Sequence, residues 1–221
     1  MKPPTKIAVV GCGGITCALA PHLALDYNLV LIDGDKFEAR NCTRQFPAMR
    51  DHAIESNKAE WLASYLRANF PERTITSIPQ YLQGPGILNH PEMAMVDFVF
   101  CAVDNNQSRR LVCHVCDIRD IPAILMGNET ESADAHLFLP GRFNPMEVHD
   151  FGPMTKAPFA CTSDDNPASE QTSRANFMAA ALGVHIFGSY LRAEKWNSIV
   201  VHSTIDTRSD SSRRRLIDFH E

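Results

Sequence analysis

The chain has 221 residues, of which 44% are hydrophobic and 21% are charged, and its formal net charge is −5. This length suits one α/β domain with a buried core, and the weak negative charge gives no general attraction to nucleic acid or to an anionic membrane. The start of the chain predicts no signal peptide and no apolar run approaches the ~18 residues that span a bilayer, so we expect a cytoplasmic protein.

The first predicted elements form a strand, a glycine turn, a helix and a second strand. The strands cover residues 7–10 and 29–32, glycines stand at 11, 13 and 14, and Asp33 closes the second strand. Glycines let the backbone approach a phosphate, a helix N-terminus favours an anion, and the acid can bind ribose hydroxyls. Thr16 interrupts the G-x-G-x-x-G fingerprint. The stretch predicts a nucleotide site, with an ordinary βαβ turn as the alternative.

Two further segments carry candidate ligand-binding residues before the middle of the chain. Residues 34–50 form a polar connection beside the second strand, either a functional loop or a solvated one. A helix is predicted over 55–70, with Lys58 in its first turn. The helix dipole does not favour a cation there. Lys58 therefore either faces an anion or is an ordinary surface lysine.

The remaining pattern continues an α/β order. A buried strand over 96–103 ends in Asp104, which is placed either to hold Mg²⁺ or a phosphate-linked water, or to cap the next helix. The other predicted elements are strands at 74–78, 121–126, 133–139 and 196–204 and helices at 107–119 and 170–193. In the last helix the predicted core face follows Phe177, Ala180, Ala181, Val184, Phe187 and Leu191.

Seven cysteines are too unevenly spaced for a disulfide scaffold. Cys113 and Cys116 form one C-x-x-C without a second, so we interpret them as structural and expect no structural zinc. Cys161 lies in a long segment, 140–167, without helical or strand periodicity. A helix begins soon after it, and a thiol near a helix N-terminus has a lowered pKa. Cys161 is therefore a candidate reactive thiol, with an idle cysteine as the alternative.

These elements predict a Rossmann-like, mostly parallel sheet with helices on both faces and antiparallel edge strands at the C-terminal end. We expect a single ATP-binding domain over 1–207, including the crossover loop at 140–167. Residues 208–221 are expected to form a polar C-terminal tail.

Several polar residues at fixed spacings make the chain resemble the ubiquitin-activating-enzyme-like adenylyltransferases of the ThiF/MoeB/HesA type. The resemblance covers most of residues 6–193. It is carried by Gly11-x-Gly13-Gly14, by Asp33-Gly34-Asp35, by Asn41-x-x-Arg44-Gln45-Phe46, and by the positions of Lys58 and Asp104. Cys161-Thr162-x-x-x-x-Pro167 resembles the narrower cysteine segment of members that form a thioester with a ubiquitin-like protein.

The resemblance implies a role for each matching residue. Asp33 would bind the ATP ribose, Asn41, Arg44 and Lys58 the triphosphate, and Asp104 would hold Mg²⁺. Gly11, Gly13, Gly14, Asp35 and Gln45 belong to the same implied ATP site. Because the family often takes the arginine from a partner subunit, Arg44 implies a homodimer or a paired protomer. The chain departs from the family at Thr16, in lacking the usual pair of zinc-binding C-x-x-C motifs, and in having no room for a separate cysteine domain or ubiquitin-fold domain.

The resulting hypothesis is an enzyme that uses ATP and Mg²⁺ to adenylate the C-terminal carboxylate of a small ubiquitin-like, β-grasp protein ending in Gly. Cys161 would then take the acyl group as a thioester, and a conjugating enzyme is a possible further partner. One alternative is adenylation of a sulfur carrier, or of a small-molecule or tRNA carboxylate, without a thioester. Others are an NAD-dependent oxidoreductase, since Asp33 suits NAD ribose equally, and a catalytically silent binding protomer.

Overall fold

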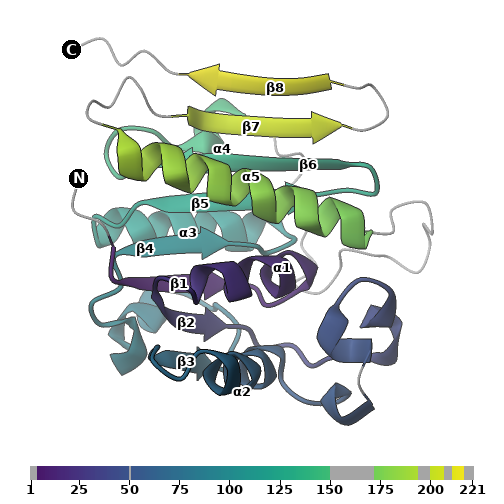
Figure 1. Ribbon diagram of the computed structural model, residues 1–221. Helices are drawn as coiled ribbons and strands as arrows, with labels where there is room; N and C mark the ends of the chain where they lie inside the picture. Colours follow the sequence, from purple (N-terminus) through teal and green to yellow (C-terminus); the bar gives the residue numbers. More distant parts are fainter. Residues whose placement is uncertain (1–3, 50, 150–171, 194–199, 207–210, 217–221) are drawn as a thin grey trace.

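The computed structural model describes residues 4–49, 51–149, 172–193, 200–206 and 211–216. Its centre is an eight-stranded sheet with the order β3-β2-β1-β4-β5-β6-β7-β8 (Figure 1). The strands are β1 (Lys6–Val10), β2 (Asn28–Ile32), β3 (Ile75–Ile78), β4 (Phe98–Cys101), β5 (Ala123–Asn128), β6 (Ser132–Phe138), β7 (Val200–Asp206) and β8 (Ser211–Leu216).

The sheet has a parallel part and an antiparallel part. β3, β2, β1, β4 and β5 pair in parallel, whereas β6, β7 and β8 add antiparallel strands at one edge. The chain runs outward from β1 to β2 and β3, then returns to place β4 on the other side of β1. Open α/β sheets bind ligands at such a reversal. The predicted Rossmann-like class with antiparallel C-terminal strands is confirmed.

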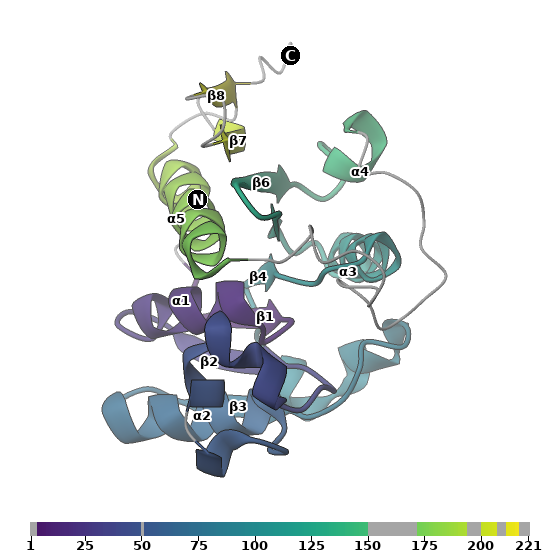
Figure 2. The same ribbon diagram turned by 90° about the vertical axis from the view of Figure 1, so that its right-hand side faces the viewer.

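Helices cover both faces of the sheet (Figure 2). On one face lie α1 (Gly14–Leu23), α2 (Lys58–Asn69) and α5 (Ser173–Arg192), and on the other lie α3 (Asn106–Ile118) and the short α4 (Pro145–Val148). The 3₁₀ helices are η1 (Ala39–Thr43), η2 (Phe46–Met49), η3 (Asp51–Ala53), η4 (Pro85–Asn89) and η5 (Pro91–Met93). Within the described residues, no helix has both the length and the apolar character that a membrane crossing requires.

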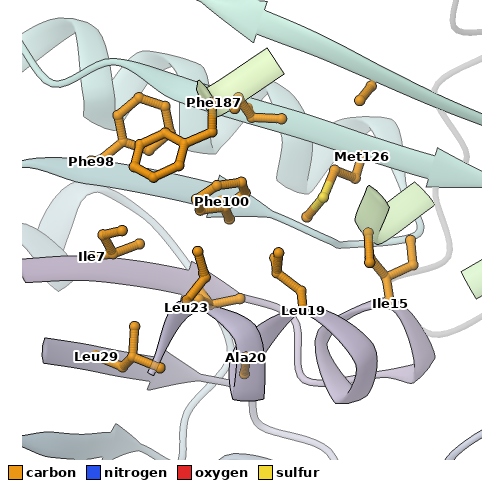
Figure 3. Close-up of a cluster of buried hydrophobic side chains, with 14 of the residues drawn as sticks. Ile7, Ile15, Leu19, Ala20, Leu23, Leu29, Phe98, Phe100, Met126 and Phe187 are labelled. Atoms are coloured by element: carbon orange, nitrogen blue, oxygen red, sulfur yellow. The ribbon is translucent and has the colours of Figure 1, made fainter. Parts of the chain in front are cut away.

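An aromatic and aliphatic core joins the central strands to α1 and α5 (Figure 3). Phe98 and Phe100 of β4 are fully buried, and the ring centroid of Phe98 lies 4.7 Å from that of Phe187 on α5. Leu19 and Leu23 of α1 pack into the same cluster. This packing fixes α1 and α5 on one face of the sheet, so that the glycine turn before α1 is held at the carboxyl end of β1.

The core face of α5 is the predicted one only in part: Ala180 and Phe187 are buried and Val184 and Leu191 pack against the core, but Phe177 and Ala181 are exposed. Phe177 is 65% exposed, whereas Ala179, Gly183 and Ile186 turn towards the sheet. A Cβ on Gly183 would lie 2.5 Å from the sulfur of Met126, so the helix backbone sits directly on β5. Only small side chains permit this close approach of helix and strand. The need for them on the sheet-facing side overrides the apolar periodicity from which Phe177 was predicted to be in the core.

Two segments expected to lack regular structure contain short elements. Within 140–167, α4 forms where Pro145 occupies the first turn and the Asn144 side chain accepts a hydrogen bond from the Met146 N–H at 3.1 Å. Within the expected polar tail, β8 pairs antiparallel with β7. Its ladder uses backbone groups, which a polar sequence supplies as well as an apolar one. The predicted tail therefore contains an edge strand of the sheet, which the sequence analysis did not expect.

Candidate functional site

A cavity of about 680 Å³ opens where β1, β2 and β4 end. Its walls include the glycine turn, the loop after β2, the first turn of α2 and the start of α3. The ten residues of the ATP site that the family resemblance implies all line this cavity. They are Gly11, Gly13, Gly14, Asp33, Asp35, Asn41, Arg44, Gln45, Lys58 and Asp104. The structure therefore brings together residues spread over nearly a hundred positions of the chain.

The glycine turn is held tightly between β2 and β4. The Gly11 N–H donates to the Ile32 carbonyl at 2.8 Å, and Gly11 has φ of +87°. A Cβ at this position would lie 2.7 Å from the Ala102 carbonyl oxygen. Thr16, which stands where a third glycine was expected, is fully buried and donates its hydroxyl to the Gly11 carbonyl. Thr16 thus braces the turn from inside α1.

Gly11→Ala should destabilise the protein by about 2–4 kcal/mol, because the positive φ and the collision with β4 add. Urea unfolding followed by circular dichroism measures this loss. Gly86→Ala is the matched control, since a Cβ there meets nothing within 4 Å. Equal stability of the two variants would show that the turn is not confined as described.

Asp33 fixes the loop after β2 to the glycine turn. Its two carboxylate oxygens accept the N–H groups of Cys12 at 2.6 Å and of Asp35 at 2.8 Å. Burial raises the pKa of Asp33 to about 6, with Lys58 opposing the rise and Asp35 adding to it. The carboxylate is thus held in a fixed orientation at the cavity wall. It gains or loses its proton near pH 6.

Lys58 is placed in the cavity by the start of α2. Asn57 caps this helix by accepting from the Glu60 N–H, and its amide donates to the carbonyls of Asp33 and Asp35 at 2.9 and 3.1 Å. The Lys58 ammonium lies 3.1 Å from a carboxylate oxygen of Asp35, and the lysine side chain is 11% exposed. Lys58 therefore faces an anion and is not a surface lysine.

Tyr81, which the sequence reasoning missed, completes the acidic side of the cavity. Its hydroxyl donates to the second oxygen of Asp35 at 2.7 Å, and this hydrogen bond together with partial burial raises the pKa of Tyr81 to about 12. The ring lies close over Gly34, where a Cβ would meet it at 2.6 Å. Tyr81 follows the end of β3. The rule that ligands bind at the carboxyl ends of strands could therefore have identified it from the sequence.

Arg44 and Gln45 carry buried polar atoms that the described residues leave unsatisfied. Arg44 Nε and Gln45 Oε1 are enclosed without a hydrogen-bond partner in that part of the chain. Asn176 of α5, 2% exposed, donates to the Arg44 carbonyl at 3.2 Å and accepts from Asn128. Buried polar atoms are normally paired. Such unpaired atoms at a cavity wall are the arrangement expected of a site that binds a polar ligand.

Asp104 and Arg109 occupy the side of the cavity formed by β4 and α3. Asp104 is exposed and follows β4, and the next residue, Asn105, caps α3 by accepting from the Ser108 N–H at 2.8 Å. Asn105 thus provides the cap, which leaves Asp104 outside that role. Arg109, on the first turns of α3, donates to the carbonyls of Val103 and Met126. Sequence reasoning missed Arg109 because its helical position alone does not reveal the cavity.

Of the predicted site residues, Cys161 lies outside the described residues. Cys12, Cys17 and Cys101 are buried in the core. Cys113 and Cys116 of α3 are also buried in the core, where desolvation raises the pKa of both thiols. These thiols remain protonated at neutral pH.

Comparison with known proteins gives a family match over almost the whole chain, since a model described as the ThiF family matches residues 4–216. The NEDD8-activating enzyme E1 catalytic subunit of Schizosaccharomyces pombe is 27% identical over 143 residues, 62% of this chain and 31% of that protein. The SAMP-activating enzyme E1 of Haloferax volcanii is 29% identical over 122 residues, 54% of this chain and 44% of that protein.

Among solved structures, the fold is similar to Escherichia coli MccB, solved with ATP, at a TM-score of 0.73 and 18% identity. That match covers 96% of this chain and 64% of the MccB chain. The chain thus spans less than half of the two curated relatives and just under two thirds of MccB. The resemblance to this family, first drawn from motifs, is confirmed by the family match.

Proposed function

The chain belongs to the ThiF family, and on that premise we propose that it uses ATP to adenylate the C-terminal carboxylate of a small ubiquitin-like protein. One observation carries the proposal: the residues matching the family's ATP site line a single cavity in which Arg44 Nε and Gln45 Oε1 lack partners among the described residues. A bound triphosphate would supply a hydrogen-bond acceptor for Arg44 Nε.

The residues around the cavity suit the parts of ATP. Asp33 would accept hydrogen bonds from the ribose hydroxyls, and Asn41, Arg44 and Lys58 would bind the triphosphate near the N-terminus of α1. The exposed carboxylate of Asp104 is an oxygen ligand of the kind that Mg²⁺ prefers, so it would hold the ion. Mg²⁺ bound there would neutralise charge on the phosphate oxygens.

The reaction follows from these positions. A carboxylate oxygen of the carrier forms a bond to the α-phosphorus while the bond from this phosphorus to the β-bridging oxygen breaks, and pyrophosphate leaves with the electron pair. Negative charge grows on the phosphate oxygens during this exchange. Arg44 and Lys58 are fixed cations that stabilise that charge without reorganising.

We assign the second step, from the sequence pattern, to Cys161. Its thiolate would attack the acyl carbon of the adenylate, forming a thioester as the bond to the AMP oxygen breaks. This cysteine lies outside the described residues, so its role stays a prediction. The pairing of two protomers also stays a prediction. In the structure Arg44 lines the cavity of its own chain.

Carrier-dependent ATP–pyrophosphate exchange tests the adenylation step. The assay uses a small β-grasp protein ending in Gly, encoded beside this chain, and the same carrier with its terminal Gly removed is the control. We expect exchange with the intact carrier only. Absence of exchange with every neighbouring carrier would contradict the ubiquitin-like substrate.

Cys161→Ala separates the two steps of the proposed reaction. We expect the variant to keep pyrophosphate exchange and to lose the thioester that non-reducing electrophoresis detects. Full conversion of the carrier by Cys161→Ala would instead favour the second candidate, in which another carboxylate is adenylated without a thioester. That candidate is supported by the fold shared with MccB, described as a Microcin C7 biosynthetic enzyme and solved with N-formylated MccA.

The pKa of Asp33 gives a pH dependence for nucleotide binding. The ionised carboxylate accepts two ribose hydroxyls better than the protonated acid does, so ATP affinity should fall as the pH falls below about 6. The loss should approach tenfold per pH unit below that pKa and should end where the affinity reaches that of the protonated form. Calorimetry between pH 5 and 8 measures the ATP affinity of the wild type and of Asp33→Asn. The protonation of ATP affects both proteins equally, so it cancels in the ratio of the two affinities. An unchanged ratio of the two affinities would contradict the assigned role.

A further inference from the structure

Three histidines from separate elements meet away from the ATP cavity. His136 lies on β6, His202 on β7, and His149 directly follows α4. One ring nitrogen from each lies within 4.8 Å of the other two, and the Nδ1 atoms of His136 and His202 are 2.9 Å apart. The ring centroid of His149 is 4.6 Å from that of His136 and 4.8 Å from that of His202.

Sheet register and helix packing create this cluster. His136 and His202 are direct partners in the antiparallel β6–β7 ladder, so their side chains leave the same face of the sheet. Their neighbours Ala135 and Val201 point to the opposite face, into the core beneath α5. Figure 2 shows α4 and α5 on opposite sides of β6, and Met146 of α4 packs in the same core cluster as Phe138. This packing brings His149 over the strand pair.

Asp134 orients the most buried member of the cluster. Its carboxylate oxygen lies 3.1 Å from Nε2 of His136, and His136 is 3% exposed. When Nε2 donates its proton to this carboxylate, the lone pair of the ring is on Nδ1, which faces His202. A carboxylate hydrogen-bonded to the far nitrogen of a ligating histidine is the usual outer-shell partner in metal sites.

We propose that His136, His149 and His202 bind one divalent transition-metal ion of the Zn²⁺ type. Imidazole nitrogens suit zinc and its neighbours, whereas Mg²⁺ prefers oxygen. Two nitrogens bound tetrahedrally to Zn²⁺ at about 2.0–2.1 Å lie roughly 3.3 Å apart, so small side-chain rotations convert the observed cluster into a site. His149 and His202 are half-buried, and water is the ligand that we propose for the fourth position.

The ion has a structural consequence of its own. It ties the end of α4 and the nearby β6 to β7, which lies more than 50 residues further along the chain. None of the three histidines is among the described residues that line the ATP cavity. The proposal differs from the sequence-based expectation of no structural zinc, because that expectation considered cysteine ligands alone. The competing explanation is a plain hydrogen bond between the two Nδ1 atoms.

Zinc titration of the full chain, first stripped of metal with a chelator, distinguishes a metal site from a plain hydrogen bond between the histidines. We expect one Zn²⁺ per chain, with affinity at least tenfold weaker in His149→Gln and in His202→Gln. Asp134→Asn keeps the three ligands and should bind 10- to 100-fold more weakly. The matched control is His22→Gln, an exposed histidine at the end of α1, which should bind like the wild type.

Cobalt is a spectroscopic probe of the ligands, because thiolate ligands add a charge-transfer absorption that imidazoles do not. We expect a Co²⁺ spectrum without that band and a Zn²⁺-dependent rise of the melting temperature in the wild type but not in His149→Gln. No zinc binding by the folded wild type, a thiolate band, or equal affinity in wild type and His149→Gln would each overturn the proposal. The wild-type measurement is decisive even where a variant folds poorly.

Discussion

Arg44→Ala should weaken ATP binding by about 10- to 150-fold, the effect of losing a charged hydrogen bond of about 1.5–3 kcal/mol. The reason is the buried Arg44 Nε, which has no partner among the described residues until a ligand supplies one. Its backbone is held separately by Asn176, so the truncation removes the guanidinium while leaving the loop anchored. Isothermal titration calorimetry with ATP measures the change.

The matched control for Arg44→Ala is Arg110→Ala. Arg110 is exposed on α3 and is not among the residues lining the ATP cavity. Its removal lowers the net charge equally and should leave ATP affinity within about twofold, because exposed charges at a distance are screened by salt. Equal losses in the two variants would mean that Arg44 acts only through overall charge.

Lys58→Ala should reduce both ATP affinity and pyrophosphate exchange by at least about 100-fold. Lys58 is the cation that pairs with Asp35, and its charge lowers the pKa of Asp33. Without it, the two carboxylates would face the phosphates with no cation to offset their charge. The cost in stability should be smaller, about 1 kcal/mol, because the Asp35 side chain is 46% exposed and solvent screens it. ATP calorimetry, exchange assays and urea unfolding measure the three quantities.

Lys36→Ala is the control for Lys58→Ala. Lys36 forms an exposed ion pair with Glu55 at 3.8 Å, with side chains 61% and 75% exposed, and lies outside the cavity lining. We expect wild-type binding and exchange. Lys58→Arg retains the charge and should recover part of the activity. Full activity in Lys58→Ala would remove this lysine from the mechanism.

The elements nearest the site could be predicted because their signals are local. The apolar runs of β1 and β2, the glycine turn and the acid after β2 fix one strand-turn-helix-strand unit. Parallel strands bring their carboxyl ends to one edge, which explains how Asp33 and Asp104 could be placed together before any coordinates. Lys58 was a candidate from its place in the first turn of a predicted helix, whereas the role predicted for Arg44 came from the family resemblance and not from periodicity.

The features that sequence reasoning missed depend on contacts between distant segments. Asn176 is 132 positions from Arg44. No local pattern shows that a side chain of α5 hydrogen-bonds to the backbone of Arg44. The register that pairs His136 with His202 is likewise set by the β6–β7 ladder. β8 was missed because backbone pairing, not an apolar pattern, attaches it to the sheet.

Calorimetric titration of the wild-type chain with ATP, and separately with NAD, shows which nucleotide the cavity binds. We expect one ATP to bind per chain in the presence of Mg²⁺ and NAD to bind much more weakly. ATP binding should be weakened in Arg44→Ala and Lys58→Ala but not in Arg110→Ala or Lys36→Ala. Tight binding of NAD with no binding of ATP, or ATP affinity equal in all four variants, would contradict the proposed ATP site.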